Sequence, residues 1–381
     1  MEYCATCVMP NTKPGVVLDH RGMCNACRAR ELKDKIDWVE RGKQLDEIVA
    51  EVKATNHPFY DCIVPVSGGK DSWFQAMMLA ETYGLKVLCV TLTALLPTTE
   101  GIGNLNNMIK DLNVDHMKIT IKPSVFKAIR KKCFVRQGEP AWAEHCAMFS
   151  SVINTALIYE VPLVVWGEDI AFEFGGIQNQ ESKPSALAIN RNDLIKEKTV
   201  SDWLDDDISE RDTLFYRYPA HEKLEASGIN SIYLGHYIKW YGRKNYEMVS
   251  KRGFTGRKNG PLAGNYLDYD NIDEKLCEIN IWFKYLKFGF WRSTDQCCYD
   301  IWNGRLSRKD AVEIVSKLSD EFPAEYFQDF LRFHQVTEEE FWETVEKFRN
   351  HDIWELIDGE WRLKYKLKDD VRFELSAPEN G

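Results

Sequence analysis

The chain has little that would place it in a membrane or outside the cell. Its 381 residues contain no apolar run of about eighteen residues, the length that a membrane-spanning helix needs. The N-terminus carries Cys4 and Cys7 where a secretion signal would have its apolar core. We therefore expect a cytoplasmic protein that binds no membrane. The length allows one large domain with one or two small ones.

The sequence also has fewer basic than acidic residues. Lys and Arg number 49 against 59 for Asp and Glu, which gives a net charge of −10. This balance argues against broad binding of nucleic acid, which needs an excess of basic side chains. The eleven cysteines, in a chain expected inside the cell, predict metal ligands or buried thiols before disulfides.

One glycine-rich turn lacks the feature of the commonest phosphate loop. A Walker motif would have glycine where this chain has Val64. The turn lies between the apolar run Cys62–Val66 and a helical pattern at Trp73–Thr82, so we expect a strand, a turn and a helix N-terminus in that order. Unpaired N–H groups at such a terminus bind anions. A glycine turn with a capping serine is the simpler reading, but six compatible residues favour phosphate binding: Ser67, Gly68, Gly69, Lys70, Asp71 and Ser72. Asp71 could hold a magnesium ion shared with the phosphates.

Two cysteine pairs lie ahead of this turn. Cys4 and Cys7 are followed, after sixteen residues, by Cys24 and Cys27. Two such knuckles can place four thiolates around a zinc ion, which would supply the folding energy that so short a segment lacks. A redox dithiol would need one pair beside a βαβ unit, so we predict a structural zinc module over residues 1–30.

The central part of the chain alternates between two patterns. Apolar runs predict strands at Cys62–Val66, Lys86–Leu92, His116–Ile121, Leu163–Trp166 and Ser231–Ile238. Helical patterns lie between them at Trp73–Thr82, Asn104–Leu112, Ser124–Cys133 and Cys146–Tyr159. This alternation predicts an α/β domain with a doubly wound parallel sheet over residues 58–240, joined to the zinc module by a connecting helix at 31–57.

Ligands of such a sheet bind beyond the carboxyl ends of the strands. Gly167, Glu168 and Asp169 follow the fourth predicted strand, and Glu173 comes shortly after. They form either a solvated acidic loop or a site for magnesium or substrate. The insertion at 178–192 is predicted to be a substrate lid. Cys133 and Cys146 match no metal pair. A cysteine that starts a helix, as Cys146 does here, is either buried packing or a thiol whose pKa the helix N-terminus lowers.

The last part of the chain, 241–381, is predicted to hold a substrate-contacting segment and a helical domain. Ser307 and Thr337 have the spacing of N-terminal helix caps. Before them, the run from Tyr285 to Arg305 is dense in arginine, lysine, aspartate and aromatic residues. Its Lys287 and Arg292 could bind a carboxylate or a phosphate.

The motifs resemble a known group of enzymes. Ser67 to Ser72 resembles the PP-loop of the ATP pyrophosphatase superfamily, whose members split ATP between its α- and β-phosphates and adenylate a carbonyl oxygen. Together with the paired cysteines and the run from Lys287 to Arg305, it resembles the bacterial N-acetyl sugar amidotransferases of O-antigen, pseudaminic acid and legionaminic acid synthesis. The resemblance implies an acetamidino product, with ATP, Mg²⁺ and Zn²⁺ as cofactors and an N-acetylated nucleotide sugar as substrate.

The resemblance also implies roles for single residues. Lys70 and Asp71 would be catalytic, and the turn would hold ATP together with Gly167 and the backbone of Val66, Val90 and Leu92. The substrate would contact Glu168, Asp169, Glu173, Lys287, Arg292 and Asp295.

A source of ammonia is missing from the sequence. There is no Gly-x-Cys-x-Gly elbow, and removal of Met1 would expose Glu2 instead of a catalytic cysteine. The resemblance implies a separate glutaminase subunit and a barrel-shaped, cyclase-like partner. Two alternatives remain at this point: a PP-loop tRNA thiolation enzyme, and a nucleotide-sensing subunit without catalysis.

Overall fold

The computed structural model describes residues 1–169, 173, 185–191, 199–319 and 321–369. At its centre lies a parallel sheet of five strands in the order β3-β2-β1-β4-β5. The strands are β1 (Cys62–Pro65), β2 (Val87–Leu92), β3 (Asp115–Ile119), β4 (Leu163–Trp166) and β5 (Asn230–Tyr233). The predicted parallel α/β fold is therefore confirmed. The strand order reverses between β1 and β4, the place where such sheets bind ligands.

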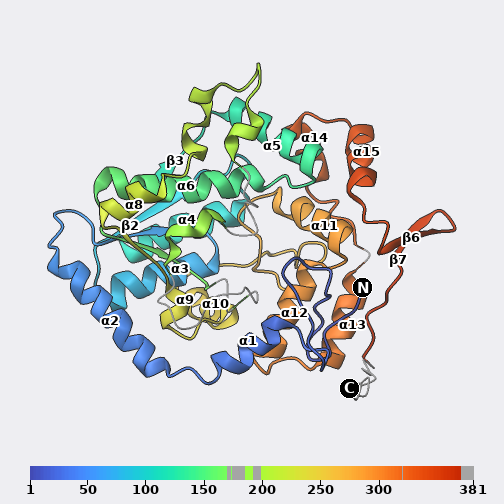
Figure 1. Ribbon diagram of the computed structural model, residues 1–381, viewed down its shortest axis with the longest axis horizontal. Coiled ribbons are helices and arrows are strands. Elements are labelled where there is room, and N and C mark those ends of the chain that lie inside the picture. The colour runs from blue at the N-terminus through green and yellow to red at the C-terminus, as the bar shows by residue number, and fades with distance from the viewer. Residues whose placement is uncertain (170–172, 174–184, 192–198, 320, 370–381) are drawn as a thin grey trace, which may run out of the picture.

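Helices cover both faces of the sheet (Figure 1). The strands alternate their side chains between two separate apolar cores, with Ile63 in one and Val64 in the other. The first core also receives α5 (Pro123–Gln137) and α6 (Trp142–Tyr159). The second receives α3 (Lys70–Met77) and α4 (Thr99–Leu112). Burial on both faces explains why the strands read as continuous apolar runs in the sequence.

Four of the five predicted strands were placed within two residues at each end, and the fifth was partly wrong. The strand predicted at Ser231–Ile238 ends at Tyr233, and a short helix, α9 (Leu234–Tyr237), follows. All four residues of α9 are buried. A short apolar run does not distinguish a strand from a buried helical turn, so the sequence could not show where one ended.

The N-terminal region runs along one side of the molecule. Helix α1 (Asn25–Lys33) begins inside the cysteine module, and α2 (Trp38–Ala54) forms most of the connecting segment. The four paired cysteines share a third apolar core with residues of α12 (Arg292–Trp302) and α13 (Arg308–Leu318). The first thirty residues therefore pack against helices almost three hundred residues away along the chain (Figure 1).

The remaining elements complete the C-terminal half. Its other described α-helices and strands are α8 (His221–Ser227), α10 (Gly242–Ser250), α11 (Cys277–Phe288), α14 (Phe327–His334), α15 (Glu338–Phe348) and the hairpin β6 (Trp354–Ile357) and β7 (Glu360–Leu363). Ser307 caps α13 by accepting the N–H of Asp310, and Thr337 forms a capping box with Glu340, as their spacing predicted. Among the described residues, no helix combines the length and apolarity that crossing a membrane requires.

Candidate active site

The glycine turn joins β1 to α3 at the carboxyl edge of the sheet. Gly68 has a φ of +97°, and a Cβ there would lie 2.5 Å from the carbonyl oxygen of Gly101 in α4. Only glycine fits this position. Gly69 is the N-cap of α3 and brings no side chain to its first turn. The turn therefore exposes a helix N-terminus without a capping side chain, which suits the phosphates of a nucleotide.

Lys70 lies between two carboxylates. Its Nζ is 2.9 Å from Oδ2 of Asp71 and 2.5 Å from Oδ1 of Asp270, and its side chain is 11% exposed. Burial opposes the charge, but Asp270 and Asp71 together raise the pKa of Lys70 above its usual value. The ammonium therefore stays charged at physiological pH and in a fixed place, as an electrostatic catalyst of phosphate chemistry requires.

Asp270 connects the turn to the C-terminal region. Its Oδ2 accepts from Nε2 of Gln296 at 3.1 Å and lies 3.5 Å from a guanidinium nitrogen of Arg292. Burial would raise the pKa of Asp270, but Lys70 and Arg292 lower it below its usual range. Asp270 is not among the site residues predicted from the sequence. The available signal was weak, namely an acidic stretch at 268–274 with no motif spacing.

Asp71 is held from the other side of the turn. Its Oδ1 accepts from Nδ2 of Asn245 in α10 at 2.8 Å, while its side chain remains 34% exposed. The carboxylate is thus oriented but still accessible. Burial and then the nearby Asp71 raise the pKa of Glu168, so these two carboxyl groups lie within electrostatic reach of each other. A cation bound between them would offset this repulsion.

The three predicted carboxylates after β4 have different surroundings. Glu168 lies near Asp71, as described above. Asp169 is buried, and its Oδ2 is 3.1 Å from Nδ1 of His236. Glu173 pairs with the buried Lys33 of α1. For Glu168, the electrostatic effect of Asp71 on its pKa links it to the glycine turn.

The residues predicted to contact the nucleotide lie in β2 or directly after β1 and β4. The N–H of Val66 donates to the carbonyl of Val90 at 2.9 Å, and the carbonyl of Val66 accepts from the Thr91 hydroxyl at 2.6 Å. Leu92 is half-buried at the end of β2. Gly167 accepts from the N–H of Gly235 at 2.9 Å. Their contacts with a base or ribose stay predictions.

The predicted substrate residues of the late run divide into two groups. Arg292 and Asp295 lie together at the start of α12, with a guanidinium nitrogen 3.9 Å from a carboxylate oxygen. Burial raises the pKa of Tyr299 well above its usual value. Asp295, Glu173 and Glu168 raise it too, and Arg292 lowers it. Lys287 instead donates to the carbonyl of Gly138 and to Glu139, at 3.0 and 3.1 Å. Arg292 and Asp295 therefore lie together beside Asp270, and the described contacts of Lys287 lie elsewhere.

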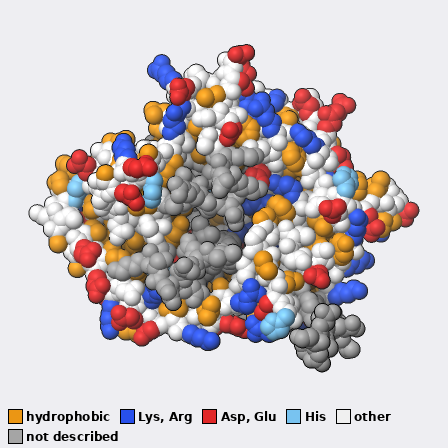
Figure 2. Space-filling view, viewed as in Figure 1, with side chains coloured by type: hydrophobic (Ala, Val, Ile, Leu, Met, Phe, Trp, Pro, Cys, Tyr) orange, Lys and Arg blue, Asp and Glu red, His pale blue; other side chains and the backbone are white. Residues whose placement is uncertain are grey.

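Figure 2 shows basic side chains near the middle of one face of the molecule. Most of the predicted lid at 178–192 lies outside the described residues. Its described part, 185–191, includes a 3₁₀ helix (Ala186–Arg191) whose Ala186 and Ile189 are buried.

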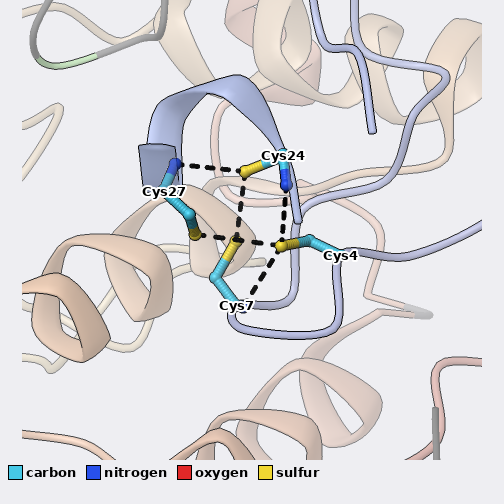
Figure 3. Close-up of side chains that lie close together, drawn as sticks. All are labelled: Cys4, Cys7, Cys24 and Cys27. Atoms are coloured by element: carbon cyan, nitrogen blue, oxygen red, sulfur yellow. Dashed lines mark hydrogen bonds between the residues drawn. The ribbon is translucent and has the colours of Figure 1, made fainter. Parts of the chain in front are cut away.

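The four N-terminal cysteines converge on one point (Figure 3). Their sulfur atoms lie within 4.8 Å of one another, with 3.8 Å between Cys4 and Cys27 and between Cys7 and Cys24. A tetrahedral metal with metal–sulfur bonds of about 2.3 Å would separate its ligands by about 3.8 Å. The Trp302 indole donates to Cys27 Sγ at 3.1 Å, and the Arg308 guanidinium donates to the carbonyl of Cys7 at 3.2 Å. The cluster can therefore hold a metal ion, and α12 and α13 support it from outside.

The two cysteines of open role are packed in the interior. Cys133 is fully buried and Cys146 is 8% exposed, and both belong to the first apolar core. Burial raises the pKa of Cys146 to about 12 and raises that of Cys133 further. Thiols in such surroundings are unreactive, so the buried reading holds for both.

The chain thus has a phosphate-type turn in a parallel α/β domain, and residues from its C-terminal region contact the side chains of that turn. Residues 263–368 match the family model of the C-terminal domain of LPS biosynthesis WbpG-like proteins. Over these residues the chain is therefore similar to a domain of LPS biosynthesis proteins, which agrees with the predicted resemblance to enzymes of bacterial surface polysaccharide synthesis. Asp270, Arg292 and Asp295 all lie inside it.

Other relatives are more distant. An uncharacterized protein of Methanocaldococcus jannaschii is 31% identical over 115 residues, which are 30% of this chain and 41% of that protein. The chain thus matches about two-fifths of the length of this relative. Among solved structures, NMN synthetase from Francisella tularensis is similar with a TM-score of 0.35 and 14% identity, over 80% of this chain and 96% of that one. The U34-tRNA thiolase NcsA from Methanococcus maripaludis, solved with its [4Fe-4S] cluster, has a TM-score of 0.26 and 13% identity, over 80% and 86%.

Proposed function

We propose that this protein is an ATP-dependent amidotransferase that converts the acetamido group of an N-acetylated nucleotide sugar to an acetamidino group. The observation that carries the proposal is the contact between Lys70 and Asp270. This contact joins the glycine turn to the region that matches the LPS biosynthesis domain, and so supports a link between nucleotide binding at the turn and a substrate of polysaccharide synthesis.

The chemistry follows from what an amide lacks. Its carbonyl is a poor electrophile, and its oxygen is a poor leaving group. In the proposed reaction the amide oxygen attacks the α-phosphorus of ATP and pyrophosphate leaves, which forms an O-adenylated imidate. Ammonia then adds to the imidate carbon, AMP leaves with the oxygen, and loss of a proton gives the amidine. No protein nucleophile is needed.

The described residues suit these steps by position and charge. Lys70 would stabilise the negative charge that develops on the departing pyrophosphate. The first turn of α3 would hold the β- and γ-phosphates. Glu168 and Asp71 could hold Mg²⁺, which supplies Lewis-acid polarisation of the phosphates when bound. Most of the rate enhancement would come from positioning and electrostatics.

The four cysteines would hold Zn²⁺ as a structural ion. Four sulfur ligands with no open position are typical of structural zinc sites. Ammonia would come from a separate glutaminase subunit through a barrel-shaped partner, as the resemblance implies. This part of the proposal is tested by comparing glutamine with ammonium salts as nitrogen donors for the purified chain; equal use of glutamine would contradict it.

The decisive experiment is mass spectrometry of nucleotide sugars incubated with the protein, ATP, Mg²⁺ and an ammonium salt. The expected product has NH in place of one oxygen atom and forms together with AMP and pyrophosphate. Formation of ADP in place of AMP would refute the proposed reaction. Asp71→Asn should abolish AMP formation while the protein stays folded, because Asp71 is partly exposed and Asn keeps its shape. Asp206→Asn, at an exposed site, is the charge-matched control.

The thiolation alternative has less support from the same observations. Such an enzyme would use accessible thiols for sulfur transfer, whereas Cys133 and Cys146 are buried with raised pKa values. Tight, strongly salt-dependent binding of tRNA would revive this alternative.

A further inference from the structure

Helix α10 packs against α3 and lies directly beside the glycine turn. Gly242, Asn245 and Val249 lie on one face of α10, because residues three and four positions apart share a side of a helix. Val249 is fully buried in the second apolar core, which also contains Trp73 of α3. A Cβ on Gly242 would lie 3.4 Å from Cε of Lys70, in ordinary van der Waals contact. This face of α10 is therefore turned toward the start of α3.

Asn245 is the residue of this face that reaches Asp71. It is 2% exposed, and its Nδ2 donates to Oδ1 of Asp71 at 2.8 Å. The amide nitrogen must be the atom that faces this oxygen, because an ionised carboxylate only accepts hydrogen bonds. The main-chain N–H of Asn245 is used within the helix, where it donates to the carbonyl of Tyr241 at 3.0 Å. The packing of α10 thus places the amide of Asn245 against the carboxylate.

The two oxygens of Asp71 have different partners. Oδ1 accepts from Asn245, and Oδ2 lies 2.9 Å from Nζ of Lys70. With a partner on each oxygen, the carboxylate cannot rotate without losing a contact. Each carboxylate oxygen can accept about two bonds, so about two acceptor positions remain, and the side chain is 34% exposed. A cation shared with the phosphates of a nucleotide would bind at these remaining positions.

A neutral donor suits this position better than a charged one. Lys70 already offsets part of the charge of Asp71 and is shared with Asp270. A second cation in place of Asn245 would neutralise Asp71 and repel a metal ion, and an anion there would repel the carboxylate itself. An amide orients the carboxylate and leaves its charge unchanged. Because the amide is buried, little water competes for the hydrogen bond.

We propose that Asn245 is a positioning residue for the magnesium ion of the nucleotide, because it holds the carboxylate of Asp71 in the orientation that binds the cation. This inference rests on the proposed function for the identity of that cation. Asn245 acts through Asp71 and is not itself a ligand of the metal. Removing a side chain that orients a metal ligand typically weakens metal binding by about 10–100-fold.

The test measures the affinity for α,β-methylene ATP, which is not cleaved between its α- and β-phosphates, by isothermal titration calorimetry. Each variant is titrated with and without Mg²⁺. The dissociation constant without Mg²⁺, divided by that with Mg²⁺, gives the contribution of the metal ion. Asn245→Leu keeps a side chain of similar shape but removes the donor, and it should lower this ratio about tenfold. Should Asn245→Leu not fold, Asn245→Ala takes its place with the same expectation.

Asn154→Leu is the matched control. Asn154 lies in α6, on the opposite face of the sheet, and its Nδ2 donates to the carbonyls of Ser150 and Arg217 at 2.9 and 3.1 Å. The control therefore also loses hydrogen bonds of an asparagine, but none to the glycine turn. Its ratio should equal that of the unaltered protein.

A double-mutant cycle distinguishes positioning from a purely structural role. Asp71→Asn should lower the ratio as well. Asn245→Leu added to Asp71→Asn should lower it no further, because the carboxylate through which Asn245 acts is already gone. A general loss of packing would instead lower the melting temperature and reduce the ratio equally in both backgrounds.

Three results would overturn the inference. They are a ratio near one for the unaltered protein, an unchanged ratio in Asn245→Leu, and an equal further loss in the Asp71→Asn background. The titrations need neither a sugar nor turnover. If the ratios follow the expectation but no nucleotide sugar yields AMP, the role of Asn245 stands and the proposed reaction is wrong. If AMP forms while Asn245→Leu keeps the full ratio, the reaction stands and the role of Asn245 is wrong.

Discussion

Replacement of Asp270 by Asn tests whether the contact between the two halves of the site stabilises the protein. Asp270 is 8% exposed and forms its ion pair with Lys70, which is itself buried. Removing one partner of a buried pair usually costs about 3–5 kcal/mol, because the other charge is left uncompensated. Lys70 keeps Asp71 as a partner, and Asn keeps one oxygen acceptor. We therefore expect Asp270→Asn to lose about 2–4 kcal/mol of the free energy of unfolding.

The assay is urea unfolding at pH 7, followed by tryptophan fluorescence, with Asp206→Asn as the charge-matched control. Because the pKa of Asp270 is lowered in the folded state, its contribution is present above its usual pKa of 3.8 and is lost as the pH falls through the lower folded value. The difference from the unaltered protein should therefore be complete at pH 7. A loss for Asp270→Asn no larger than that for the exposed control would refute the reasoning.

Three further outcomes follow from the structure. Gly68→Ala should lose ATP binding and at least about 1 kcal/mol of stability, because its φ is positive and its Cβ would meet the Gly101 carbonyl; normal ATP affinity in calorimetry would contradict this. Chelation of the metal, or Cys4→Ser, should lower the melting temperature and release one equivalent of zinc, measured by a colorimetric indicator; a protein without zinc that melts normally would count against the site. The stability that Glu278→Gln gains over the unaltered protein should be larger at pH 8 than at pH 5, by about 1 kcal/mol or more. Burial raises the pKa of Glu278 to about 8, so the stability that its protonated form contributes is present below its usual pKa of 4.5 and is lost as the pH rises toward 8; the same difference between variant and unaltered protein at both pH values would show that the pKa of Glu278 is not raised.

Local pattern was enough for much of the fold. The strands are buried on both faces, so each appears as an apolar run, and the glycine turn between β1 and α3 needs glycine for its own backbone. The spacing of the cysteine pairs likewise predicted the four-cysteine cluster, because each Cys-x-x-Cys pair is a local structure and the two pairs are close together in the chain. Local pattern was not enough at the end of the fifth strand. The buried residues after Tyr233 form a helical turn, and hydrophobicity alone does not distinguish a buried strand from a buried helical turn.

The sequence by itself determined the parallel α/β core, the phosphate-type turn with Lys70 and Asp71, and the cysteine cluster. In each case the responsible residues are close together in the chain, so their spacing carries the information. Tertiary structure alone decided that Asp270 pairs with Lys70, that Lys287 pairs with Glu139, and that Lys13 reaches α12. These partners are between 148 and 282 residues apart. Which charges meet over such separations depends on how the helices pack on the sheet, and no local pattern records it.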